Sequence, residues 1–243
     1  MKIPKRINPD NLKDTLVQVL FNPGISPELF LGTFNHAFSE VFTFKAALPK
    51  RKELKISEAE GLIFEPLEKG YFLDKEEKIK VDVSGNAIVF NTFKDYILWD
   101  NYFPVISATI ERLFATGMIK EINRIGIRYI SQFDNTSLID NLNMNLSLDI
   151  ANKNLEATQL RTEFVENEFR VILTLINRIN QLQGEVKKDM NTSIIDIDVI
   201  QLPVDMKDSK SAIEAIKNGH QKQKTTFFSL LKPAFLETLN PEY

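Results

Sequence analysis

Two short segments typical of β-strands carry the side chains with the clearest chemical potential. In Ile-Asn-Arg-Ile-Gly-Ile-Arg-Tyr-Ile at residues 122–130, alternate side chains share a face, so Arg124, Gly126 and Arg128 lie together. Arginine presents a planar fork of donors that suits carboxylate and phosphate, and glycine lets a ligand approach the backbone. This face is therefore a candidate anion site, such as a nucleotide or RNA sensor would need. The opposite face carries apolar side chains that we expect in the core: Ile125, Ile127, Tyr129 and Phe133.

The second segment, residues 194–200, places Asp196 and Asp198 on one face of a strand. Two such carboxylates can share a Mg²⁺ with substrate phosphates, which would suit a divergent metal-dependent nuclease. The sequence has no Gly/Ser-rich phosphate loop, however, and no Lys at nuclease-like spacing on that strand. An Arg row beside an Asp row is also an ordinary cross-strand charge pairing. We favour that structural interpretation over either ligand site.

Histidine and cysteine offer little further chemistry. His220 is in line with apolar residues of the last predicted helix, so we expect a half-buried hydrogen-bonding residue rather than a base. His36 lies one residue off the apolar stripe of the first predicted helix. The chain has no Cys, which excludes disulfides, thiolate nucleophiles and Cys-based metal sites. We expect no cofactor and no metal beyond the weak Asp196 and Asp198 candidate.

An aromatic group precedes the central predicted helix and includes the only Trp of the chain. Tyr96, Trp99, Tyr102 and Phe103 are spaced so that they can anchor the start of that helix on a sheet. The functional alternative is a contact surface for a partner, because Trp and Tyr dominate such surfaces. We therefore keep Tyr96, Trp99 and His220 with Arg124 and Arg128 as candidate binding residues.

The composition narrows the class of protein. The 243 residues include 18 Phe, which indicates an aromatic-rich core because Phe has no polar atom. The net charge of −3 disfavours nucleic acid as a partner, although a local basic patch stays compatible with it. There is no secretory signal pattern and no apolar run of membrane-spanning length. We expect a cytoplasmic protein that does not enter a membrane.

Both halves of the chain follow the order β-α-(several β)-α. The first half is predicted to contain a strand at 12–21, a helix from 26–27 to about 42, strands at 61–66, 70–74, 79–83 and 87–93, and a helix at 101–116 ended by Gly117. The second is predicted to contain a strand at 122–133, a short helical segment opening at 136–137, strands at 145–150, 157–165, 169–176 and 193–202, and a helix at 209–231. The polar stretch 183–191 is interpreted as a loop or a strand extension.

This order predicts an α+β fold: a curved, mainly antiparallel sheet with long helices on one face. No linker divides the chain, so we expect one interwoven domain over 1–243, with halves at 1–118 and 119–243. The halves share no residue-level identity. A pseudo-twofold duplication is therefore a hypothesis from the order of elements alone.

One family resemblance rests on a few spaced residues. Tyr96-x-x-Trp99-x-x-x-Phe103, then Arg-Ile-Gly-Ile-Arg-Tyr-Ile at 124–130, then His220 and Phe227-Phe228, resemble a sporadically distributed family of bacterial proteins of unknown function. In that family a Gly commonly precedes the Trp and an Asn follows the Arg-Tyr-Ile; here these positions are Leu98 and Ser131. The resemblance implies no activity. The family's patchy distribution implies accessory genes, such as phage-conflict (antiviral defence) or mobile-element loci.

No Gly-rich nucleotide loop and no hydrolase nucleophile motif occurs in the chain. We therefore expect a non-enzymatic binding or assembly protein that contacts a protein partner or forms a homodimer. The first alternative is the nucleotide or RNA sensor that uses Arg124 and Arg128. The second is the metal-dependent nuclease that uses Asp196 and Asp198.

Overall fold

The computed structural model describes residues 2–46, 70–144, 158–183, 186–202 and 205–243. In the first half, the elements are β1 (Leu12–Pro23), α1 (Pro27–Ala37), β2 (Phe42–Lys45), β3 (Tyr71–Asp74), β4 (Ile79–Val83), β5 (Ala87–Thr92) and α2 (Trp99–Ala115). In the second half they are β6 (Ile119–Asp134), the 3-10 turn η1 (Ile139–Asn141), β7 (Thr158–Glu166), β8 (Phe169–Gln183), β9 (Val186–Gln201), α3 (Ser209–Leu230) and α4 (Pro233–Thr238).

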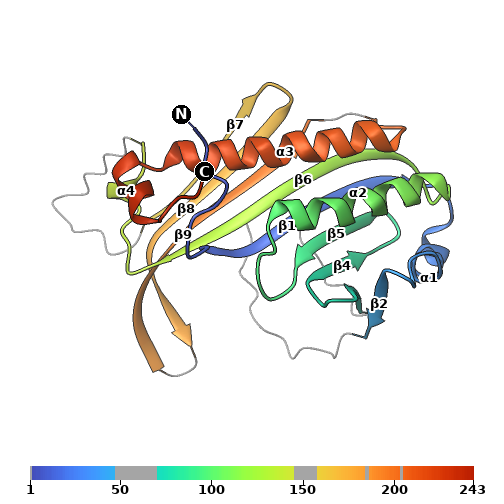
Figure 1. The fold of residues 1–243 in the computed structure, drawn as a ribbon, viewed down its shortest axis with the longest axis horizontal. Coiled ribbons are helices and arrows are strands. Elements are labelled where there is room, and N and C mark those ends of the chain that lie inside the picture. Colours follow the sequence, from blue (N-terminus) through green and yellow to red (C-terminus); the bar gives the residue numbers. More distant parts are fainter. Residues whose placement is uncertain (1, 47–69, 145–157, 184–185, 203–204) are drawn as a thin grey trace.

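The strands form one nine-stranded sheet in the order β2-β3-β4-β5-β1-β6-β9-β8-β7 (Figure 1). Every pair of neighbours is antiparallel. The first strand of each half, β1 or β6, lies at the centre, and the later strands of that half extend outward to its own edge. The predicted α+β class with a mainly antiparallel sheet is confirmed.

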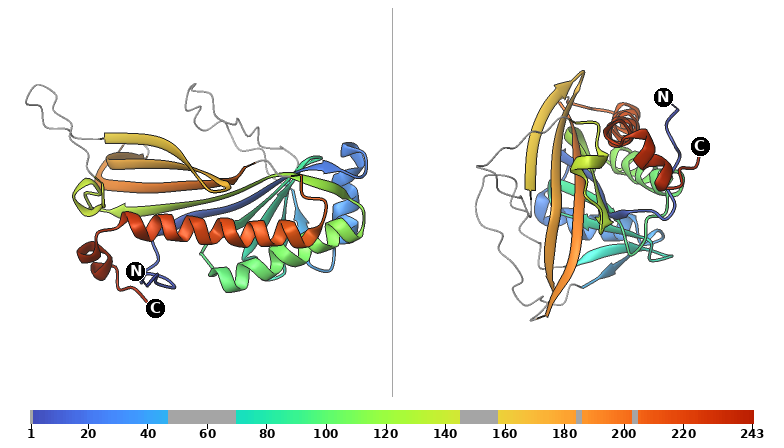
Figure 2. Two further views of the ribbon diagram at one scale, coloured as in Figure 1. Left: turned by 90° about the horizontal axis from the view of Figure 1, so that it is seen from above. Right: turned by 90° about the vertical axis from the view of Figure 1, so that its left-hand side faces the viewer.

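The helices lie on one face of this curved sheet, with α2 and α3 side by side across its middle (Figure 2). Strand β6 shows why. Ile125, Ile127 and Tyr129 alternate with Gly126 and Arg128 and are buried beneath the helices. Gly219 allows α3 to approach closely, because a Cβ there would lie 2.5 Å from the Cδ1 atom of Ile127. Both hydrophobic clusters of the core lie between the helices and this face of the sheet.

The first helix is shorter than its apolar spacing predicts. The spacing of Phe34, Phe38 and Phe42 suits a helix to residue 42, but α1 ends at Ala37 and Phe42 begins β2. The three rings still pack together, with centroids of Phe34 and Phe38 4.4 Å apart and those of Phe34 and Phe42 6.1 Å apart. A tight turn after Phe38 satisfies the same contacts, so the periodicity alone placed the helix end wrongly.

Three further expectations have different outcomes. Much of the polar stretch 183–191 is a strand extension, because β8 and β9 continue as a paired ribbon beyond the rest of the sheet. Pro233 does not only follow α3; it also begins the short helix α4. The strands expected at 61–66 and 145–150 lie outside the described residues. None of the helices in the described ranges is both long and apolar enough to cross a membrane.

Candidate functional site

The face of the sheet away from the helices carries a compact group of polar side chains. Within the described residues, α1 to α4 all pack on the other face, as Figure 2 shows. Adjacent strands β1, β6 and β9 each contribute to the group. We call it the charged patch; its members are Gln18, Arg124, Gly126, Arg128, Asp196 and Asp198.

Arg128 and Asp196 form the most ordered pair of the charged patch. The Arg128 Nε and Nη2 atoms donate to the two carboxylate oxygens of Asp196 at 2.9 and 2.7 Å. In the sheet register Arg128 lies opposite Asp198, so this bidentate pair runs diagonally to the neighbouring row. The side chain of Asp196 is 16% exposed and that of Arg128 45% exposed. The hydrogen bond to Asp196 raises the pKa of Arg128, so its charge is held in place.

Arg124 has a different environment. Its Nη1 atom donates to Oε1 of Gln18 at 2.9 Å, across the β1–β6 pair. A Cβ built on Gly126 would lie 3.7 Å from Gln18 Oε1, 3.8 Å from Asp198 Oδ1 and 3.9 Å from Arg124 Nη2. Three polar groups from three strands therefore surround the one position of the patch that has no side chain.

Asp198 completes this arrangement without a direct hydrogen bond in the described residues. Burial raises the pKa of its carboxyl, and the nearby charges of Arg124 and Arg128 oppose that shift. The described residues contain no cluster of three or more potential metal-binding side chains. Because both oxygens of Asp196 bind Arg128, a metal shared by the two aspartates would have to displace a guanidinium. The geometry offers hydrogen bonding and charge, and it does not offer a preformed metal site.

The substitution of Asn for Asp is expected to change the free energy of unfolding in opposite directions at Asp196 and Asp198. Asp196→Asn removes the charged partner of Arg128 and should lower the free energy of unfolding by about 1 kcal/mol, since Arg128 is partly exposed. Asp198→Asn removes a carboxylate whose ionisation is disfavoured in the folded state, so stability should rise at neutral pH. A raised folded pKa means that the wild-type protein loses stability as pH rises through it, and the Asn variant should lack this loss. Urea denaturation at pH 4 and pH 7 measures both; equal effects of the two variants would contradict this assignment.

The second group of predicted residues meets on the helix face. His220 is far from Tyr96 and Trp99 in the sequence, but all three belong to one aromatic cluster with Tyr129 of β6. The rings of Trp99 and His220 are stacked, with centroids 3.8 Å apart and an interplanar angle of 8°. The hydroxyls of Tyr96 and Tyr129 lie 3.4 Å apart. We call Tyr96, Trp99, Tyr129 and His220 the aromatic cluster; it joins α2 and α3 to the sheet.

The electrostatics of the aromatic cluster favour a neutral histidine. Burial, with a smaller contribution from the charge of Lys224, lowers the pKa of His220 to about 3. Its buried Nδ1 atom has no hydrogen-bond partner among the described residues. Burial likewise raises the pKa of Tyr96 to about 12. These side chains are uncharged near neutral pH, so the cluster resembles a packing unit more than an acid–base site.

Strain accompanies the start of α2. Leu98, the residue before Trp99, has φ 67° and ψ 151°, a backbone conformation that is strongly disfavoured for residues other than glycine. Leu98→Gly is therefore expected to raise the free energy of unfolding by about 1 kcal/mol, after the entropy cost of glycine is subtracted. Leu98→Ala keeps the Cβ and the strain, so it is the matched control and should not stabilise. Thermal unfolding of the two variants decides the point.

The two groups lie back to back on β6. Arg128 faces the charged patch and its neighbour Tyr129 faces the aromatic cluster, so the predicted candidates divide into two separate places. Sequence reasoning missed Gln18, which is 7% exposed and interrupts an otherwise apolar run in β1. That interruption was a detectable signal for a polar role.

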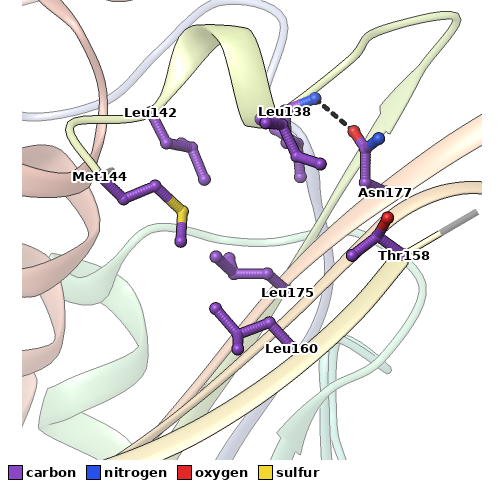
Figure 3. Close-up of a pocket in the computed structure, with 8 residues that line it drawn as sticks. Leu138, Leu142, Met144, Thr158, Leu160, Leu175 and Asn177 are labelled. Carbon is purple, nitrogen blue, oxygen red and sulfur yellow. Dashed lines mark hydrogen bonds between the residues drawn. The ribbon is translucent and has the colours of Figure 1, made fainter. Parts of the chain in front are cut away.

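One small apolar pocket lies away from both groups, between η1 and the β7–β8 hairpin (Figure 3). Its lining residues are Leu138, Ile139, Leu142, Met144, Thr158, Leu160, Leu175 and Asn177. The Asn177 Oδ1 atom accepts from the Leu138 backbone N–H at 2.7 Å, so this amide positions the η1 turn. Leu160 and Thr158 place the pocket beside the outermost strand of the sheet.

Comparison with known proteins does not assign the chain to a family. No family model, no curated protein and no solved structure matches the chain. Conclusions about function therefore depend on the geometry above.

Proposed function

We propose that this chain is a non-enzymatic binding or assembly protein that recognises a protein partner with the charged patch. The observation that carries the proposal is the balance of the patch: two arginines and two aspartates lie together on the sheet face away from the helices, where Arg128 binds Asp196 and the charges of both arginines act on Asp198. Their formal charges cancel, so the patch has no net attraction for a polyanion. A protein surface with its own mixed charges complements it better.

The surroundings of the patch support the same kind of partner. Leu16 and Ile172 lie in the row that contains Arg128 and Asp198, and both are only partly buried. Ile130 and Ile200 flank the patch in adjacent rows. Apolar side chains around arginine anchors are typical of protein–protein interfaces.

Affinity capture from the native host with a matched pair of variants tests this proposal. Arg124→Glu reverses a charge inside the patch, and Lys217→Glu reverses one on the exposed side of α3. We expect a specific protein to be captured by the wild type and by Lys217→Glu, and to be lost with Arg124→Glu, while all three proteins keep similar melting temperatures. Equal capture by all three would contradict the proposal.

A nucleotide or RNA sensor is the second candidate, because Arg124 donates one hydrogen bond within the described residues, to the neutral Gln18, and retains donors for a phosphate. The double variant Arg124→Ala/Arg128→Ala should then abolish binding of nucleotide or RNA, with binding measured by fluorescence polarisation. Salt-insensitive or absent binding by the wild type would remove this candidate.

A metal-dependent nuclease is the third candidate. It has less support, because Arg128 already binds both carboxylate oxygens of Asp196. Incubation of the wild type with DNA or RNA and Mg²⁺ or Mn²⁺ tests it. Cleavage that disappears in Asp196→Asn would favour it; cleavage equal in both proteins would exclude this pair of residues.

The resemblance to a sporadically distributed bacterial family supports a cytoplasmic role in an accessory system, such as a phage-conflict or mobile-element locus. The same order of elements in both halves supports an ancient duplication. In each half the first strand is central, the later strands return beside it, and α2 or α3 follows. Superposition of 1–118 on 119–243 should align β1 with β6, β5 with β9 and α2 with α3.

A further inference from the structure

Strand β7 forms one edge of the sheet, and its outer side has no neighbouring strand in the described part of the chain (Figure 1). Arg161 to Glu166 are all exposed, and Phe164 and Val165 are 39% and 61% exposed. Proteins normally protect such an edge, because its free N–H and C=O groups can pair with another chain. This nine-residue edge strand, with exposed apolar side chains in its second half, is therefore a candidate for pairing with another chain.

The hairpin geometry shows which backbone groups of β7 are free. A two-residue loop, Asn167-Glu168, joins β7 to β8, and Glu166 lies opposite Phe169 at its base. A two-residue loop closes on a hydrogen-bonded pair, and such pairs recur at every second residue. The backbone groups of even-numbered residues in β7 therefore bind β8. Those of Gln159, Arg161, Glu163 and Val165 point outward.

The sequence of β7, Thr-Gln-Leu-Arg-Thr-Glu-Phe-Val-Glu, is complementary to itself in reverse about its central Thr162. If two copies pair antiparallel about this residue, Arg161 of each lies opposite Glu163 of the other. Leu160 then lies opposite Phe164, and Thr162 opposite Thr162. Opposite charges, apolar pairs and Thr–Thr pairs are the favourable cross-strand combinations.

The backbone permits this register. With Thr162 at the centre, Arg161 pairs with Glu163 and Gln159 with Val165, so every hydrogen-bonded pair joins two outward-pointing residues. Centring the pair on Arg161 or Glu163 also permits hydrogen bonds, but it places two identical charges opposite each other. The charges on β7 therefore select one register as well as discouraging pairing with unrelated strands.

The apolar pocket beside β7 gives a second, independent indication. Leu160 and Thr158 line this pocket, and they lie on the same sheet face as Phe164. In the Thr162-centred register, the exposed ring of Phe164 from a second copy lies directly opposite Leu160, at the mouth of the pocket. Twofold symmetry repeats the contact, so each copy offers one ring and one pocket.

We propose that the chain forms a symmetric homodimer through edge strand β7, paired antiparallel about Thr162 into one continuous sheet. The helices of both copies then cover the same face of the joined sheet. The charged patches of both copies lie on the other face, and β9, the patch strand nearest the new junction, is separated from β7 by β8. The dimer does not depend on what the patch binds.

Charge reversal with complementation tests the proposal. Glu163→Arg and Arg161→Glu each place like charges opposite one another twice across the junction. In the double variant Arg161→Glu/Glu163→Arg, every junction pair is again opposite in charge. A mixture of the two single variants also restores every pair, because one chain carries two positive residues and the other two negative ones. Lys217→Glu, on the exposed side of α3, is the control.

Sedimentation velocity over a range of concentrations gives the readout, with circular dichroism melts to confirm folding. We expect the wild type, the double variant, Lys217→Glu and the mixture to form dimers. We expect each single variant alone to be monomeric and folded. A wild type that stays monomeric at every concentration, single variants that still dimerise, or a mixture of folded variants that fails to associate would overturn the proposal. Protection of the Arg161 and Glu163 amides from hydrogen exchange in the wild type, and its loss in Glu163→Arg, places the contact on the outer side of β7.

Discussion

His220→Phe is expected to abolish a large part of the loss of stability that the wild-type protein shows on acidification. His220 has a pKa of about 3 in the folded state, against an ordinary value of 6.5. The unfolded chain therefore binds a proton that the folded chain rejects at pH values between these limits. Stability is fully present above pH 6.5 and falls by about 1.4 kcal/mol for each pH unit below it.

Phenylalanine keeps an aromatic ring against Trp99 but carries no titratable nitrogen. Between pH 6.5 and 5.0, the wild type should lose about 2 kcal/mol more than His220→Phe, as measured by urea denaturation at both pH values. At pH 7 the variant should be at least as stable, because the buried Nδ1 atom without a partner is removed. His36→Phe, which changes an exposed histidine of α1, is the control and should follow the wild type. Parallel pH profiles for all three proteins would contradict the buried, neutral state of His220.

Phe34→Ala is expected to cause the largest loss of stability among single aromatic truncations. Phe34 is fully buried and contacts the rings of Phe38 directly after α1, Phe42 of β2 and Phe72 of β3. Truncation of such a ring costs about 3–5 kcal/mol, and a shift of about 10 °C in melting temperature follows for a chain of this size.

Phe164→Ala provides the comparison, because Phe164 is 39% exposed on the edge strand. Truncation there should change the unfolding free energy of the monomer by less than about 0.5 kcal/mol. It should instead weaken dimerisation. If the two variants melted at the same temperature, the division between an aromatic core and an exposed aromatic edge would be wrong.

The layout of the fold was largely predictable because period-2 and helical patterns persist through long elements. The alternation in 122–133 predicted both the strand and its buried face, since only one face of β6 packs against helices. The end of α1 was not predictable in this way. The rings at 34, 38 and 42 meet their partners in a helix or in a helix followed by a turn, so spacing does not distinguish the two.

The candidate site was also predictable only in part. Strand alternation was enough to place Arg124 and Arg128 on the face of Asp196 and Asp198. Which residues pair was not predictable, because it depends on sheet order and register: Arg128 reaches diagonally to Asp196, and Arg124 binds Gln18 from the opposite neighbouring strand. The stacking of His220 on Trp99 needs the relative placement of α2 and α3, which no local pattern contains.

Site-specific photocrosslinking tests whether a protein partner is recognised on the charged sheet face. Thr174 of β8 lies opposite Asp196 in the register, so a photoreactive residue there would report on what covers the patch. A photoreactive residue in place of Lys217, on the exposed side of α3, is the matched control. After irradiation in the native host, we predict one discrete protein adduct from position 174 that resists nuclease and is absent from position 217. No adduct from position 174, the same adducts from both positions, or an adduct removed by nuclease would contradict recognition of a protein partner on this face.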